Sequence, residues 1–81
     1  DGARELSFWM KNTLVPLDII FVGEDMRVLN VEHASTETGV PDDELTRYRS
    51  DGGAQYVVEA ERGYANRTGV SPGDRLVIER R

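Results

Sequence analysis

The chain lacks cysteine entirely and contains a single lysine. Without cysteine in its 81 residues, neither a disulfide nor a thiolate metal site can stabilise the domain, so a hydrophobic core must do so. The ten basic residues are nine arginines and Lys11. No apolar run approaches the roughly 20 residues that a bilayer-spanning helix needs, so we expect no membrane-spanning segment in this sequence.

The charge balance is acidic, because fifteen Asp and Glu residues against ten basic residues give a net charge of −5. A general nucleic-acid binder needs clustered cations for its phosphate contacts, so we expect no nucleic-acid partner. Few lysines beside many acidic residues are typical of proteins adapted to high salt, including those of haloarchaea. A mesophile with GC-rich codons produces a similar composition, and both interpretations stay open.

Alternating apolar residues and turn signals predict five strands and one short helix. Residues 17–22 are apolar on both parities after Asp18, which is typical of a strand covered on both faces. The first three strands are expected to form an antiparallel meander, and the polar residues 34–53 a long loop. The predicted strands cover residues 5–12, 17–22, 26–33, 54–60 and 75–80, and the helix covers residues 62–68.

These elements predict a single domain over residues 1–81 with a mostly β, α+β fold. Five strands in a flat sheet would leave the sheet edges and one apolar face exposed to solvent. A small, strongly curved antiparallel sheet or barrel, plugged by the short helix before the last strand, avoids this exposure. The residues expected to be mainly buried are Phe8, Met10, Leu17, Ile19, Phe21, Val28, Val58 and Ile78.

Three sequence blocks resemble the domain of unknown function 192 (DUF192) family. They are FWMKNT with PLDIIF (residues 8–13 and 16–21), YVVE (56–59), and GYA with GV and GD (63–65, 69–70 and 73–74). The resemblance implies a mostly β, barrel-like prokaryotic domain, often secreted or membrane-attached, hence an extracytoplasmic location. The family's upstream segment is absent from this sequence. The resemblance supplies no catalytic residues and no cofactor.

Lys11 and its neighbours are the first candidate binding residues. Lys11 shares its strand parity with Trp9, so an ammonium beside an indole face could hold an anionic or hydroxyl-rich ligand. Alternatively, its stem only covers the tryptophan. Asn12 belongs to the same group, although its side chain also suits local turn hydrogen bonds.

Asp18 and Glu59 are the candidate carboxylates. Asp18 could pair with Lys11 or cap backbone N–H groups of the turn at residues 13–16, and Glu59 faces either a cleft or solvent. Together they would suit general acid–base chemistry or a hard cation. No metal-ligand motif is present, so we expect no metal and no cofactor. His33 is interpreted as a strand-end residue, and the glycosylation pattern at Asn66 as a chance match.

The sequence thus leaves three functional hypotheses. The leading one is a non-enzymatic binding or accessory domain for a small polar, anionic or saccharide ligand of the cell envelope. Its wall would be Trp9, Lys11, Asn12, Asp18 and Glu59, overhung by the loop at residues 34–53. The alternatives are a hydrolase-like enzyme that uses Asp18 and Glu59, and a structural domain that docks onto a protein partner through an edge strand.

Overall fold

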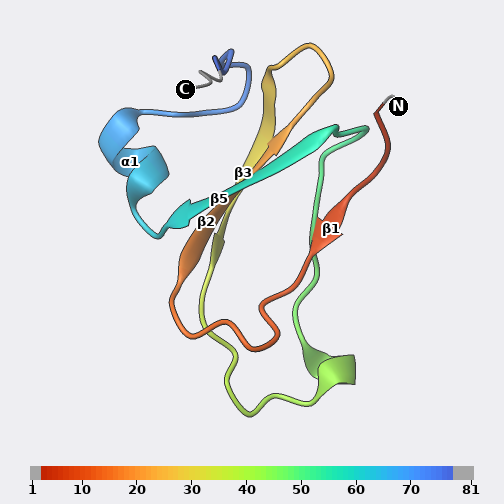
Figure 1. The fold of residues 1–81 in the computed structure, drawn as a ribbon, viewed down its shortest axis with the longest axis vertical. Coiled ribbons are helices and arrows are strands. Elements are labelled where there is room, and N and C mark those ends of the chain that lie inside the picture. Colours follow the sequence, from red (N-terminus) through yellow and green to blue (C-terminus); the bar gives the residue numbers. More distant parts are fainter. Residues whose placement is uncertain (1–2, 78–81) are drawn as a thin grey trace, which may run out of the picture.

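The central strand of the domain is β2 (Leu17–Val22), and five of its six residues are buried. The computed structural model describes residues 3–77. β2 pairs antiparallel with β3 (Val28–Ala34) on one side and with β5 (Tyr56–Glu61) on the other, giving the strand order β3-β2-β5 (Figure 1). The apolar residues on both parities of β2 therefore serve a strand that is covered on both faces.

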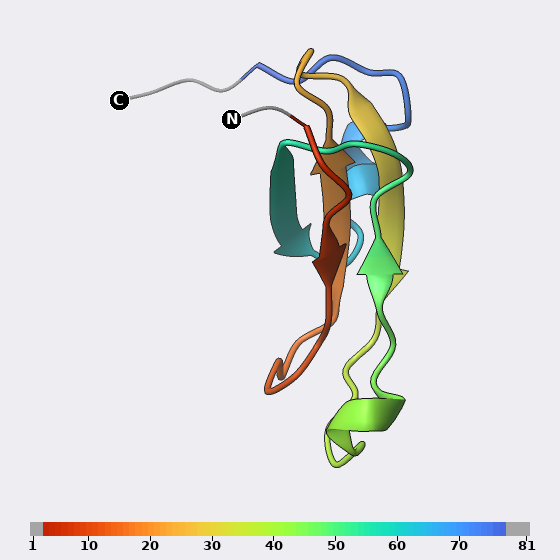
Figure 2. The same cartoon turned by 90° about the vertical axis from the view of Figure 1, so that its right-hand side faces the viewer.

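A second, two-stranded sheet consists of β1 (Ser7–Phe8) and β4 (Tyr48–Arg49). Figure 2 shows these two strands side by side as a layer separate from the three-stranded sheet. The expected meander is therefore only half correct, because β2 and β3 form a hairpin while β1 pairs with β4. The reason is packing: Phe8 covers the face of the larger sheet that carries Ile19 and Phe21.

The core is divided between the two faces of the three-stranded sheet. Beneath β1 and β4 the buried residues are Met10, Ile19, Phe21, Ala34 and Ala54. On the other face they are Ile20, Val22 and Val28, packed against Val31, Val58, Val70 and Leu76. Over the described residues 3–77 the domain is therefore mostly β, with antiparallel sheets, five strands and one short helix.

The helix α1 (Tyr64–Thr68) is shorter than expected and starts two residues later. Gly63 and Gly69 flank it with φ values of 99° and 77°, a left-handed conformation that only glycine adopts without strain. No helix within residues 3–77 is long and apolar enough to cross a membrane.

The segment at residues 34–53 contains more structure than a loop. It includes the 3-10 turn η1 (Asp42–Glu44) and β4, both in the segment that the sequence analysis treated as a loop. β4 is only two residues long, too short for alternation to reveal.

The predicted core agrees with the observed burial where the structure describes it. Met10, Ile19, Phe21 and Val28 are buried. The other three described residues are partly buried and pack against the two clusters: Phe8, Leu17 and Val58. Ile78 and the end of the last predicted strand lie outside the described residues. At the start of that predicted strand, the backbone of Arg75 forms an isolated antiparallel β-bridge with that of Arg27.

Replacing Ile19 with alanine should cost roughly 2–5 kcal/mol of unfolding free energy, because its side chain is 0% exposed in the central strand. Urea denaturation followed by circular dichroism measures the loss. Leu14→Ala is the matched control, since Leu14 is 77% exposed and its truncation should change stability by less than about 0.5 kcal/mol. Equal losses in the two variants would contradict the assigned core.

Candidate functional site

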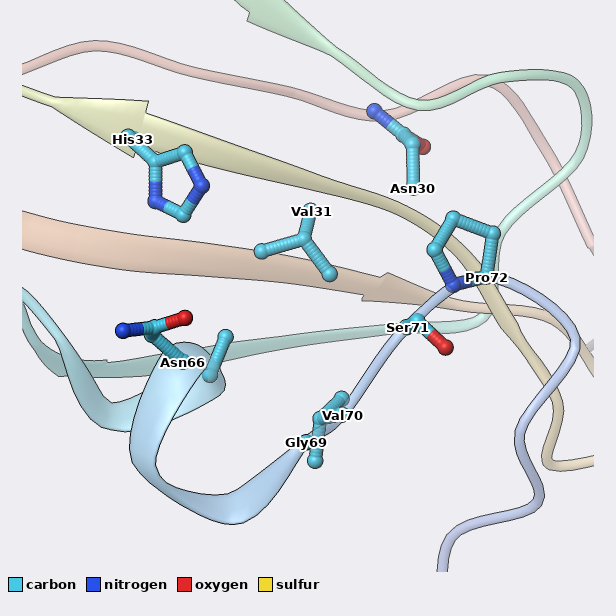
Figure 3. Close-up of a pocket in the computed structure, with 9 residues that line it drawn as sticks. Asn30, Val31, His33, Asn66, Gly69, Val70, Ser71 and Pro72 are labelled. Atoms are coloured by element: carbon cyan, nitrogen blue, oxygen red, sulfur yellow. The ribbon is translucent and has the colours of Figure 1, made fainter.

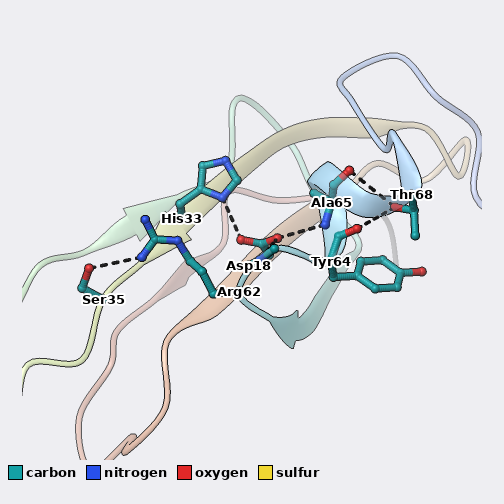
Figure 4. A network of polar contacts seen from close by, with 8 residues as sticks. Asp18, His33, Ser35, Arg62, Tyr64, Ala65 and Thr68 are labelled. Carbon is teal, nitrogen blue, oxygen red and sulfur yellow. Dashed lines mark hydrogen bonds and ion pairs between the residues drawn. The ribbon is translucent and has the colours of Figure 1, made fainter.

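A fully buried carboxylate, Asp18 on β2, connects three parts of the fold. The Oδ2 atom accepts hydrogen bonds from the backbone N–H groups of Gly63 (3.1 Å) and Ala65 (2.9 Å) at the start of α1. The Oδ1 atom lies 2.7 Å from Nδ1 of His33 on β3 (Figure 4). The left-handed Gly63 lets the chain turn so that both N–H groups meet one oxygen.

These contacts keep Asp18 ionised. Burial alone would raise the pKa of its carboxyl group, because the charged form is less well solvated there. The hydrogen bond from Ala65, the hydrogen bond and charge of His33, and the hydrogen bond from Gly63 outweigh burial, and the pKa is lowered below its ordinary value. Asp18 is therefore a carboxylate at neutral pH and can only accept hydrogen bonds.

The ionised Asp18 fixes the orientation and the tautomer of His33. Since the carboxylate can only accept, Nδ1 of His33 must carry the proton of their hydrogen bond. Asp18 and His33 are directly opposite each other in the β2–β3 pairing, so backbone register holds the pair together. The His33 side chain is 54% exposed, and its other ring nitrogen, Nε2, makes no hydrogen bond with any residue in 3–77.

The imidazole of His33 lines a pocket of about 420 Å³ between β3 and α1 (Figure 3). One wall comes from β3 and includes His33 and Val31, and the opposite wall comes from α1 and includes Asn66. The remaining lining belongs to the chain that follows α1, where Val70 and Pro72 add apolar surface. The pocket therefore combines a positioned imidazole and an amide with an apolar floor, as small-molecule sites commonly do.

The charge of this pocket differs from that of the whole protein. The chain carries fifteen acidic residues, yet none of those within residues 3–77 lines the pocket. Arg62, just after β5, projects over the same face, where its guanidinium donates to the Ser35 hydroxyl beside His33 (Figure 4). The surroundings of His33 therefore contain one buried carboxylate and one nearby cation.

Three of the expected site residues lie at the opposite side of the three-stranded sheet, near β1. Lys11 forms an ion pair of 2.7 Å with Asp42 of η1. Its Nζ atom is 5.4 Å from the ring centre of Trp9, and the guanidinium of Arg47 is closer, at 4.0 Å. Lys11 and Asn12 line a smaller pocket of about 130 Å³ with the segment around η1.

The two expected carboxylates, Asp18 and Glu59, lie on opposite faces of the sheet. Asp18 pairs with Ala60 in β5, whereas Glu59 pairs with Ile19. Because successive side chains of a strand point to opposite faces, Glu59 shares the face of Ile19 and is exposed there. The structure therefore brings Asp18 together with neither Glu59 nor Lys11, and Asp18 caps the start of α1 rather than the turn at residues 13–16.

His33 is the residue that sequence reasoning set aside and the structure places at a pocket. A signal for it existed in the hairpin, because Asp18 lies four residues before Val22 and His33 five residues after Val28, and the register irregularity between Phe21 and Val22 takes up the difference. In the hairpin turn the N–H of Met26 donates to the carbonyl of Gly23, and antiparallel pairing then aligns Asp18 with His33. Within residues 3–77, no cluster of three or more His, Asp or Glu side chains is arranged to hold a metal ion.

The DUF192 family, described as an uncharacterized ACR, matches residues 1–78. The chain belongs to this family. A comparison of this chain with curated proteins finds no match. The family assignment confirms the resemblance carried by the three sequence blocks.

Two crystal structures resemble this DUF192 domain. One is a protein from Sinorhizobium meliloti, provisionally described as a transcription regulator, with 36% identity and a TM-score of 0.74 over 91% of this chain and 54% of that protein. The other is a protein of unknown function from Novosphingobium aromaticivorans, with 45% identity and a TM-score of 0.73 over 90% and 49% of the two chains. The DUF192 chain thus spans about half the length of either relative.

The Asp18→Asn variant should lower the unfolding free energy by roughly 1–3 kcal/mol at neutral pH, because an amide cannot accept all three hydrogen bonds. Because the pKa of Asp18 is lowered in the folded state, the stability lost in Asp18→Asn depends on pH. Asp18 contributes its full stability above the ordinary carboxyl value of 3.8, and this contribution is lost as pH falls through the lower folded-state value. The gap in melting temperature between the parent and the variant should therefore narrow below about pH 4.

Thermal melts between pH 2.5 and 7 measure this gap. Asp43→Asn is the control, since Asp43 is an exposed aspartate of η1. A gap for Asp18→Asn that stays constant over the whole pH range would show that the carboxylate charge does not contribute as described.

Proposed function

We propose that this DUF192 domain is a binding domain whose pocket between β3 and α1 receives a small polar ligand. The observation that carries the proposal is the buried Asp18 carboxylate, which holds an otherwise exposed imidazole at the edge of the pocket. A histidine that only covered the surface would not need a buried charge behind it. Fixing the orientation of a ring before the ligand arrives reduces the entropy cost of binding.

Binding is favoured over catalysis by the groups around His33. An Asp–His pair activates a nucleophile when a hydroxyl or thiol lies within hydrogen-bond reach of the second ring nitrogen. The chain contains no thiol, and within residues 3–77 His33 hydrogen-bonds to Asp18 alone. The nearby Ser35 hydroxyl instead accepts a hydrogen bond from Arg62.

The provisional description of the Sinorhizobium meliloti relative raises the question of nucleic-acid binding. The net charge of −5 opposes direct phosphate contacts by this domain. A ligand-recognising role is compatible with a protein that regulates transcription, because the other half of that relative lies outside the match. We therefore propose small-molecule recognition rather than nucleic-acid contact.

We propose a second binding position at Lys11 and Asn12, for which the sequence analysis suggested an anionic or saccharide ligand. The observation in its favour is the pair of cations, Lys11 and Arg47, beside the ring of Trp9. The smaller pocket and the ion pair of Lys11 with Asp42 make this position secondary. A ligand there would have to compete with a carboxylate of the protein itself.

The Asn66→Phe variant should fill the larger pocket and abolish binding there, because Asn66 lies on its α1 wall. The test is a screen of small polar molecules by amide chemical-shift perturbation. Hits should shift the amides of Val31, His33 and Val70 in the parent and not in Asn66→Phe. Arg67→Phe is the matched control, since Arg67 is the next residue of the helix and does not line the pocket. Hits that shift only distant amides, or that persist in Asn66→Phe, would refute the proposal.

Lys11→Met should change the unfolding free energy by less than about 1 kcal/mol, because its ion pair is exposed, at 41% for Lys11 and 59% for Asp42. If the secondary position binds anions, the variant should weaken the binding of a sulfated monosaccharide. Asp42→Asn should strengthen it by freeing the ammonium. Calorimetric titration with the sulfated monosaccharide measures the affinity of both variants and of the parent. Identical affinities would refute anion binding at this second position.

A further inference from the structure

The pocket beside His33 has the features of a site for an oxyanion. Its polar groups on opposite walls are the His33 imidazole and the Asn66 side-chain amide; the amide can always donate a hydrogen bond, and the exposed ring nitrogen can do so when the ring is protonated. No acidic residue within residues 3–77 lines it. Asp18 lies behind the imidazole, where its carboxylate is fully buried and already accepts three hydrogen bonds.

The position of Asp18 decides what the exposed ring nitrogen can do. Because Nδ1 donates to Asp18, Nε2 donates only when the ring is protonated and accepts only when the ring is neutral. When the ring is protonated, an anion in the pocket would meet an N–H donor of a positively charged ring, whose charge Asp18 balances from behind.

The charged groups near His33 come from two neighbouring elements. β2 contributes Asp18, and the chain after β5 contributes the cation Arg62, which reaches Ser35 beside the ring. α1 lines the pocket with Ala65 and Asn66, and the described part of the segment after it, up to residue 77, contributes no ionisable side chain to the lining. Among residues 3–77, no carboxylate therefore lies on the pocket side of the ring.

We propose that the pocket binds the carboxylate or phosphoryl group of a small organic anion, through Nε2–H of His33 and the amide of Asn66. The apolar part of the ligand packs against Val31, Val70 and Pro72. This inference rests on the proposed binding function and specifies its ligand class. Because Nε2 carries a proton only in the protonated ring, anion binding through it weakens as pH rises.

The test uses four probes that share a phenyl group and differ in the polar group: phenylacetate, phenyl phosphate, phenylacetamide and 2-phenylethylamine. Amide chemical shifts are followed in titrations at pH 5.5 and pH 8.0. Phenylacetate, phenyl phosphate or both should shift the lining amides. Their affinity should fall at the higher pH, because Nε2 donates a hydrogen bond only from the protonated ring. The neutral amide and the amine should not bind. Comparing the two anions shows which oxyanion the pocket prefers.

Two variants separate the roles of the polar groups. The His33→Gln variant should bind the anions more weakly, and its affinity should no longer depend on pH. The Asn66→Ala variant should bind them more weakly at both pH values but keep the pH dependence of the affinity. Melting curves of both variants establish that they are folded. A loss of pH dependence in Asn66→Ala, or its retention in His33→Gln, would contradict the assigned roles.

The outcomes also separate this inference from the proposed function. If the amide or the amine shifts the lining amides more strongly than the anions, or if affinity rises with pH, the pocket is a binding site and the oxyanion assignment is wrong. If none of the four probes shifts these amides, the oxyanion assignment is overturned. The broader screen against Asn66→Phe then decides separately whether the pocket binds any polar ligand.

Discussion

The arrangement of this domain depends on one buried carboxylate, that of Asp18. A charge in the interior is costly unless hydrogen bonds replace its water, and Asp18 receives them from Gly63, Ala65 and His33. These partners belong to the start of α1 and to β3. The side chain therefore ties the helix and the hairpin to the central strand, and it does so with contacts that have a defined direction, which apolar packing alone does not supply.

The same contacts build the candidate binding pocket. One wall carries His33 and the other begins at Ala65, and both residues are partners of Asp18. The width of the pocket and the orientation of the ring thus depend on one side chain. This explains how a domain of 81 residues with a thin core can hold a polar group in a fixed position. Stability and the proposed recognition would be coupled here, since the group that stabilises the fold also orients the group that would meet a ligand.

The three-stranded sheet also divides the residues that sequence reasoning had placed on one wall. Trp9, Lys11 and Asn12 lie with β1 and η1, whereas Asp18 faces α1 on the other side of the sheet. Glu59 differs from Asp18 by one step of strand alternation. A shift of one residue along a strand moves a side chain to the opposite face of the sheet. It cannot be recognised from the sequence unless the register of strand pairing is known. The domain consequently has two separate polar regions, and the one with the larger pocket contains His33.

The sequence by itself determined β2, its burial on both faces and the end of α1 at Gly69, because these depend on local apolar pattern and backbone preference. It also determined the family. The partner of β1, the short β4 and the pairing of Asp18 with His33 and α1 were decided by tertiary structure. These contacts join residues 15 to 47 positions apart. The hairpin hints at the Asp18–His33 pair, but its register, with an irregularity between Phe21 and Val22, and the position of α1 depend on how whole strands pack.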